Sequence, residues 1–226
     1  MNLEEHYNQL YKTSSEAILN QKYSLDLNIH NPSDSRYGAT ILIRPSEKIK
    51  EKIHSFLDDL KKIEPNQYYY PNSDIHITVL SIISCYEGFS LDKIDAEDYV
   101  KIIQKSLEDS GEIKIKFHGV TASDSAIMIQ GFPTDENLNN LRDKLRENFR
   151  KTTLEQSIDS RYSISAAHAT VMRFTEELQN TERLIAKTNE FRDFDFGEFI
   201  VEKLEFVLND WYQREENTIH LKDFEL

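Results

Sequence analysis

Cysteine, glycine and tryptophan are scarce in this chain of 226 residues. Cys85 is the single cysteine, so an intrachain disulfide is excluded. The six glycines are scattered and form no glycine-rich phosphate loop. No stretch approaches the ~20 apolar residues of a membrane helix, and the acidic first residues contain no apolar signal segment. We therefore expect a cytoplasmic protein that is not associated with a membrane.

Positive charge is also in short supply, with 27 Lys and Arg against 40 Asp and Glu and a formal net charge of −13. Proteins bind long nucleic acids by neutralising phosphates with Lys and Arg, so we expect no long nucleic-acid partner. A small phosphorylated ligand is compatible with this charge, because local donors can outweigh a distant field that salt screens. The length is sufficient for one large domain or two small lobes.

A strand–helix–strand pattern occurs twice in the chain, which indicates an internal duplication. Each copy continues with a helical stretch and another β-like run, so both halves read β–α–β–α–β. The predicted elements are, in order, 39–44, 49–60, 75–80, 100–107 and 113–120 in the first half, and 126–130, 138–149, 166–172, 181–188 and 199–208 in the second. A last strand is predicted over 218–224.

These elements predict an α/β (α+β) fold with two similar lobes, whose antiparallel-type sheets face a central cleft. We expect a single domain over 37–226, with lobes at roughly 37–122 and 123–226 and final strands that are able to cross between them. Apolar residues at helical spacing in the first 20 positions predict a helix. Residues 1–30 are therefore interpreted as a helical extension that precedes the domain.

One tetrapeptide pattern ends each strand–helix–strand unit: His76-Ile77-Thr78-Val79 and His168-Ala169-Thr170-Val171. Side chains at i and i+2 share a face of a strand, so each His shares a face with its Thr. Roughly 0.4 His-x-Thr matches are expected by chance at this composition, so two in equivalent places are significant. Lobes related by a twofold axis would bring the two pairs to opposite walls of the cleft.

Two imidazoles and two hydroxyls that face each other suit in-line displacement at a phosphodiester. One imidazole can take a proton while the other gives one, since histidine titrates near pH 6.5. The hydroxyls can donate to phosphoryl oxygens that carry charge in the transition state. No further His, Cys or carboxylate cluster lies beside the motifs at metal-ligand spacing, so we expect no metal and no cofactor.

Two His-x-Thr-x motifs on paired strands of a duplicated α/β fold resemble the 2H phosphoesterase superfamily. This superfamily includes the bacterial RNA 2′,5′-ligase/cyclic phosphodiesterase group and the plant and animal cyclic nucleotide phosphodiesterases. The resemblance covers about residues 37–226. It implies a bilobal fold and metal-independent chemistry on 2′,3′-cyclic or 2′,5′-linked phosphodiesters. It also implies His76 and His168 as acid and base, with Thr78 and Thr170 holding the phosphate.

Four further residues are candidate substrate contacts. Tyr70 precedes the first motif and could stack on a base, since aromatic rings are tolerant stacking platforms. Arg161 and Tyr162 precede the second motif and are candidate ligand contacts. Arg173 stands where an arginine often closes the second motif in the ligase-like group. On a regular strand, however, Arg173 would point to the face opposite His168, so a structural ion pair is an equal alternative.

The sequence therefore predicts a phosphoric diester hydrolase that acts on a small nucleotide or a short oligonucleotide, and a monomer is expected. Two alternatives from other classes remain. A non-catalytic nucleotide-binding or sensor protein would bind such ligands without turnover. A sugar epimerase of the mutarotase type would use two histidines on unphosphorylated aldoses and leave phosphodiesters intact.

Overall fold

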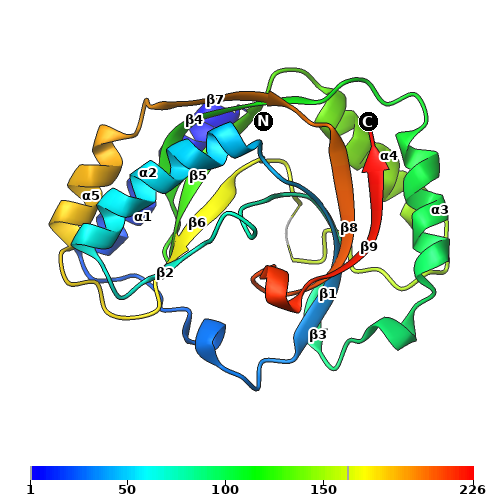
Figure 1. Cartoon of the computed structure of the whole chain (residues 1–226), viewed down its shortest axis with the longest axis horizontal. Helices are drawn as coiled ribbons and strands as arrows, with labels where there is room; N and C mark the ends of the chain where they lie inside the picture. Colours follow the sequence, from blue (N-terminus) through cyan, green and yellow to red (C-terminus); the bar gives the residue numbers. More distant parts are fainter. Residues whose placement is uncertain (1, 162) are drawn as a thin grey trace.

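Two antiparallel sheets face each other in the computed structural model, which describes residues 2–161 and 163–226 (Figure 1). The helices are α1 (Leu3–Leu19), α2 (Glu47–Ile63), α3 (Ala96–Leu107), α4 (Asn137–Arg150) and α5 (Thr181–Glu190), with short 3-10 helices η1 (Leu27–His30), η2 (Leu91–Lys93) and η3 (Glu215–Asn217). The strands are β1 (Arg36–Ile43), β2 (Tyr68–Tyr69), β3 (Ile77–Glu87), β4 (Lys114–Ala122), β5 (Ala126–Pro133), β6 (Ala169–Arg173), β7 (Asp195–Ile200), β8 (Lys203–Asp210) and β9 (Ile219–Glu225).

The strand order is β3-β1-β8-β9 in the first sheet and β2-β6-β5-β4-β7 in the second. Helices α3 and α4 cover the outer side of the first sheet, and α1, α2 and α5 cover that of the second (Figure 1). The predicted mixed α/β fold with two antiparallel sheets and an N-terminal helix is therefore confirmed. None of the helices in the described part of the chain is both long and apolar enough to span a bilayer.

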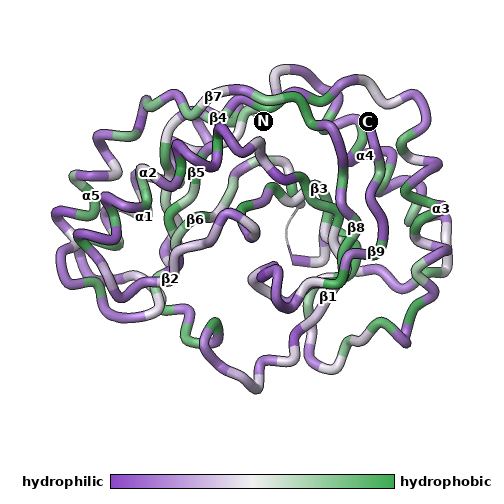
Figure 2. Tube along the Cα trace, viewed as in Figure 1, coloured by the Kyte–Doolittle hydropathy of each residue, from purple (hydrophilic) through white to green (hydrophobic). Residues whose placement is uncertain are grey.

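The helices form where the sequence supplies both a start signal and an apolar stripe. Asn2 caps α1 by accepting from the amides of residues 4 and 5, and Asp95 caps α3. In α2, the apolar positions recur every three or four residues and are buried, from Ile49 to Leu60. Figure 2 shows the result, since the hydrophobic residues follow the strands while the helices alternate between hydrophobic and hydrophilic positions.

The two halves of the sequence exchange elements between the lobes. Strand β4, from the first half, lies in the second sheet, whereas β8 and β9, from the second half, lie in the first sheet. Likewise, α2 packs on β6 and β7, and α4 packs on β3. The crossing of the final strands was allowed for, but that of β4 was not, so the lobes are not the contiguous segments 37–122 and 123–226. The single strand predicted over 199–208 is wrong for the same reason: β7 and β8 belong to different sheets, and the chain crosses between them at residues 201 and 202.

Each motif strand carries a β-bulge at the valine of its motif. The residues on either side of Val79 pair with consecutive residues of β1, so Val79 is an extra residue in β3. The residues on either side of Val171 pair with consecutive residues of β5, so Val171 is an extra residue in β6. A bulge shifts the alternation of side chains by one position. The residues that directly follow each valine therefore point to the face opposite to the one that a regular strand would give.

Candidate active site

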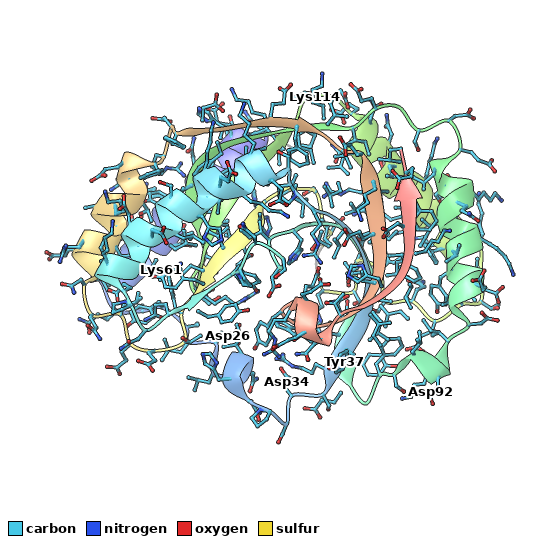
Figure 3. All side chains as sticks on the ribbon, in the orientation of Figure 1. Asp26, Asp34, Tyr37, Lys61, Asp92 and Lys114 are labelled. Atoms are coloured by element: carbon cyan, nitrogen blue, oxygen red, sulfur yellow. The ribbon has the colours of Figure 1, made fainter. Side chains whose placement is uncertain are left out.

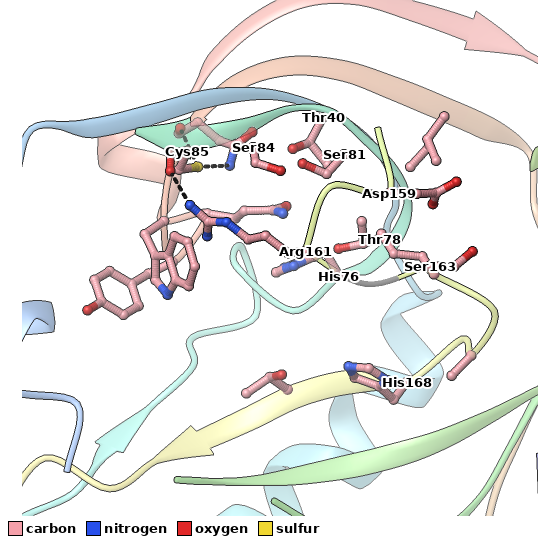
Figure 4. A pocket seen from close by; sticks show the side chains of 18 of the residues that line it. Thr40, His76, Thr78, Ser81, Ser84, Cys85, Asp159, Arg161, Ser163 and His168 are labelled. Carbon is pink, nitrogen blue, oxygen red and sulfur yellow. Dashed lines mark hydrogen bonds between the residues drawn. The ribbon is translucent and has the colours of Figure 1, made fainter. Parts of the chain in front are cut away.

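The two motifs line one cleft of about 500 Å³ between the sheets. His76 directly precedes β3 and His168 directly precedes β6, so each imidazole stands at the start of its strand. Thr78 and Thr170 line the same cleft. Figure 4 shows His76 and Thr78 on one side and His168 on the other, from different elements. The fold thus brings together all four motif residues, although the two motifs are separated by 92 positions in the sequence.

The imidazole of His76 is held by the backbone just before it. Its Nδ1 lies 2.6 Å from the carbonyl oxygen of Asp74. Because a carbonyl only accepts, Nδ1 carries the proton and Nε2 keeps a lone pair. Burial lowers the pKa of His76 to about 3, helped by the positive charges of Arg44 and Arg173 and opposed by the bond to Asp74. This imidazole is therefore neutral at pH 7 and able to accept a proton.

His168 is neutral at pH 7 as well. Burial lowers its pKa to about 4, and the charges of Arg142, His6 and Arg173 act in the same direction. No hydrogen bond joins its ring to another described residue, so its orientation depends on the backbone that carries it. Ala167 and Ala169 on either side are fully buried, which fixes that backbone.

Arg173 points into the cleft, contrary to the face expected from a regular strand. Arg173 and Thr170 pair with Ala126 and Met128 of β5, two positions apart, and therefore share a face. The bulge at Val171 is the reason for the difference. The guanidinium donates to the hydroxyl of Tyr70 at 2.8 Å and forms a 3.1 Å ion pair with Asp26. Arg173 therefore lines the cleft and also forms a structural ion pair, the two roles that the sequence left as alternatives.

Tyr70 is almost completely buried, with 1 % of its surface exposed. Its ring packs edge-on against Tyr68 at 5.1 Å, and its backbone amide donates to the carbonyl of Val171 at 3.0 Å. The ring thus offers no open face for a stacked base. Its contacts instead support the bulge of the second motif and orient Arg173.

Arg161 lines the cleft next to the loop between β8 and β9. Its Nη2 donates to the carbonyl of Cys85 at 2.9 Å (Figure 4). Its guanidinium lies 4.5 Å from the ring centre of Trp211. The guanidinium of Arg36 also lies against Trp211, at 4.7 Å. Two cations thus pack on one indole ring. Tyr162, the other candidate beside the second motif, lies outside the described residues.

The sequence reasoning missed one imidazole of the cleft. His6 comes from α1 and lines the same cavity as the motif histidines. Its neighbour Tyr7 is buried, with its hydroxyl donating to the carbonyl of Gly131 at 3.1 Å and accepting from the amide of Ala167 at 3.3 Å. These bonds fix α1 beside the second motif. Nothing in the sequence around His6 repeats the motif pattern, so no signal was available.

The charge of the cleft is opposite to that of the whole chain. Asp159 is the only carboxylate among the described residues that line it, and Arg146 neutralises it through an ion pair of 2.9 Å. Arg161 and Arg173 are the guanidiniums in the lining. Within residues 2–161 and 163–226, no group of three or more His, Cys, Asp or Glu side chains is placed to hold a metal ion.

No protein-family model matches this chain, and no curated protein has a significantly similar sequence. Solved structures do resemble it. TT0787 of Thermus thermophilus aligns with a TM-score of 0.57 at 13% identity, covering 84% of this chain and 97% of that one. The E. coli LigT complexed with 3′-AMP gives 0.55 at 12% identity, covering 84% and 98%. A structure described as a phosphoesterase gives 0.53 at 12% identity, also covering 84% and 98%.

The alignments extend over nearly the full length of each neighbour. At such low identity they establish the fold and leave the reaction open. The fold agrees with the one that the two His-x-Thr-x motifs implied. The chain has the fold of the E. coli LigT and phosphoesterase structures.

Proposed function

We propose that the protein is a metal-independent phosphodiesterase that opens a 2′,3′-cyclic or 2′,5′-linked phosphodiester of a small nucleotide. The observation that carries this proposal is the placement of two imidazoles and two threonine hydroxyls around one cleft. The fold shared with a phosphoesterase structure supports the same reaction class.

In this mechanism one imidazole removes a proton from the attacking water and the other protonates the leaving oxygen. Thr78 and Thr170 donate hydrogen bonds to the non-bridging oxygens of the phosphate. His76 is suited to act as the base, because Asp74 holds the proton on Nδ1 and leaves Nε2 free. The acid must be protonated in the complex. The negative charge of the bound phosphate favours that protonation, because it raises the pKa of a nearby imidazole.

The charge and size of the cleft support a small anionic substrate. Its guanidinium groups contrast with a chain of net charge −13, so anions are attracted locally. A volume of about 500 Å³ lies within the ~300–1,000 Å³ range of small-molecule sites. Similar E. coli LigT structures hold 3′-AMP, ATP and NADP+, which supports a nucleotide as the ligand class.

Turnover of a panel of 2′,3′-cyclic nucleotides and 2′,5′-linked dinucleotides, with a chelator present, tests the proposal. His76→Gln and His168→Gln should each lower turnover by ~10²-fold or more, because each removes an acid or base. His54→Gln is the matched control, since His54 is half-buried on α2 and does not line the cleft.

Two results would contradict the proposal: turnover that the chelator abolishes, or turnover that both motif variants retain. If 3′-AMP binds without any turnover, the cleft has a binding role, as in a sensor protein. Turnover of unphosphorylated aldoses with intact phosphodiesters would instead identify a sugar epimerase.

A further inference from the structure

Arg142 is a completely buried arginine, with 0 % of its surface exposed. It lies on α4 among Leu138, Leu141, Leu145 and Phe149, in the stripe that faces the first sheet. An arginine in an apolar stripe is unusual, because burying a charge is costly unless it is paired. Packing alone therefore does not explain why an arginine occupies this position.

The guanidinium of Arg142 binds backbone carbonyls of both motif segments. Its Nε donates to the carbonyl of Val79 at 3.0 Å, and its Nη2 donates to that of Thr78 at 3.0 Å. Nη2 also donates to the carbonyl of Ala166 at 2.8 Å, two residues before His168. One side chain thus connects the bulge of the first motif to the approach of the second.

The second motif shows why the first requires this side chain. There the carbonyl of the bulged Val171 accepts from the backbone amide of Tyr70, on the segment that begins with β2. Strand β3 is instead at the edge of its sheet, and no other strand of the described residues pairs with it on that side. The guanidinium supplies the donors that a neighbouring strand supplies in the second motif. The duplicated motif is therefore completed in two different ways.

The charge of Arg142 has no ion-pair partner among the described residues, although the carboxylate of Asp143 raises its pKa from a greater distance. No carboxylate forms an ion pair with it, and its fourth hydrogen bond goes to the neutral amide of Asn139 at 3.5 Å. Burial lowers its pKa to about 10, so it stays protonated at pH 7. After burial, this charge is the largest cause that lowers the pKa of His168. An unpaired positive charge thus lies behind the cleft.

We propose that Arg142 is a positioning residue, which holds the two histidine motifs at a fixed spacing and provides an unpaired charge that the anionic group of the substrate balances. The positioning role stands on the three carbonyl contacts alone. The electrostatic role rests on the function proposed above, because it requires an anion in the cleft.

Two variants separate these roles. Arg142→Met removes the charge and every donor at similar length. Arg142→Lys keeps the charge but loses the planar fork that reaches three carbonyls. Arg183→Met is the control, since Arg183 is an exposed arginine on α5 that does not line the cleft. The measurements are kcat and KM per folded molecule, binding of inorganic phosphate and 3′-AMP, and the NMR titration of the His168 imidazole in the ligand-free protein.

The NMR titration requires attention to the charged and titratable groups that act on His168, which are Arg142, His6, Arg173 and the other motif imidazole, His76. We expect Arg142→Met to move the His168 midpoint to higher pH, to weaken phosphate binding several-fold and to lower kcat by ~10-fold to 10²-fold. Arg142→Lys should retain phosphate binding and the His168 midpoint but still lose kcat. Arg183→Met should match the wild type in all three measurements.

A loss of thermal stability with unchanged kcat, phosphate binding and His168 midpoint would overturn the proposal, because Arg142 would then only support the core. If Arg142→Met does not fold, an unchanged kcat in Arg142→Lys is sufficient to overturn the positioning role. If the wild type turns over no phosphodiester, the proposed function fails. The His168 titration and phosphate binding then still decide whether Arg142 acts on the cleft.

Discussion

Asp26 and Arg173 form an ion pair of 3.1 Å that connects the segment after α1 to the strand of the second motif. The other carboxylate oxygen of Asp26 accepts from the hydroxyl of Tyr212 at 2.6 Å. Tyr212 belongs to the loop between β8 and β9, so Asp26 joins the two lobes at one side of the cleft. Figure 3 labels Asp26 near β2, where the N-terminal segment passes the opening between the lobes.

Asp26→Asn should therefore weaken substrate binding more than it weakens the fold. The amide loses the charge that orients Arg173 and presents a donor to a guanidinium that needs an acceptor. We expect KM to rise by about tenfold, equivalent to about 1.4 kcal/mol, with a smaller change in kcat. Steady-state kinetics checks this. Asp223→Asn is the control, since Asp223 pairs with Lys203 at 2.9 Å and does not line the cleft. An unchanged KM would contradict the prediction, because the charge of Asp26 would then not be needed to orient Arg173.

Gly131→Ala should displace the backbone that carries His168. A Cβ at Gly131 would collide with the carbonyl oxygen of Ala167, so the segment before the motif must move. A misplacement of about 1 Å is able to cost ~10²-fold in rate. Gly88→Ala is the control. A side chain at Gly88 would also strain the backbone, because φ is +80° there, but this turn lies away from the motifs. Both variants should lose thermal stability, and only Gly131→Ala should lose turnover per folded molecule. Equal loss in both would contradict the prediction.

The pKa values of the motif histidines also predict how stability depends on pH. Both are lowered in the folded state, to about 3 for His76 and about 4 for His168, from about 6.5 in the unfolded chain. Between pH 6.5 and 4 the unfolded state therefore binds more protons, and acidification destabilises the fold. Each histidine contributes up to about 1.4 kcal/mol per pH unit to this loss of unfolding free energy.

Urea unfolding at several pH values checks this contribution. His76→Gln and His168→Gln should each reduce the loss of unfolding free energy between pH 6.5 and 4.5. His54→Gln should follow the wild type. Identical slopes in all four proteins would mean that the motif imidazoles titrate normally and are not desolvated.

The two kinetic parameters should differ in their pH dependence. kcat/KM reports the free enzyme, in which burial and the charge of Arg173 lower both histidine pKa values, and kcat reports the complex. The bound phosphate anion raises the pKa values of the pair, so the optimum of kcat should lie at higher pH than that of kcat/KM. Arg173→Met should shift the kcat/KM profile to higher pH. Coincident optima for kcat and kcat/KM would contradict this expectation.

The sequence was sufficient to predict the mixed α/β fold and its two antiparallel sheets, but not the division of 199–208 between β7 and β8. The fold was predictable because the repeated His-x-Thr-Val pattern lies in short apolar runs, and the spacing of apolar residues within a short run is visible in the sequence. The orientation of Arg173 was not predictable, because it depends on the bulge at Val171. In a strand this short, the alternation of apolar and polar residues does not reveal a bulge. His6 was missed for another reason. Its place beside His168 comes from the long-range bonds of Tyr7, which no local pattern encodes.

The exchange of strands between the halves also has a consequence for folding during synthesis. Strand β1 pairs with β3 on one side and with β8 on the other, about 170 residues later in the chain. The first sheet, which carries the first motif, therefore stays half-formed on the ribosome until β8 and β9 have been made. Until then β1 exposes an unpaired edge of apolar residues, which is a site for aggregation. A nascent chain that stalls before residue 203 is expected to need a chaperone.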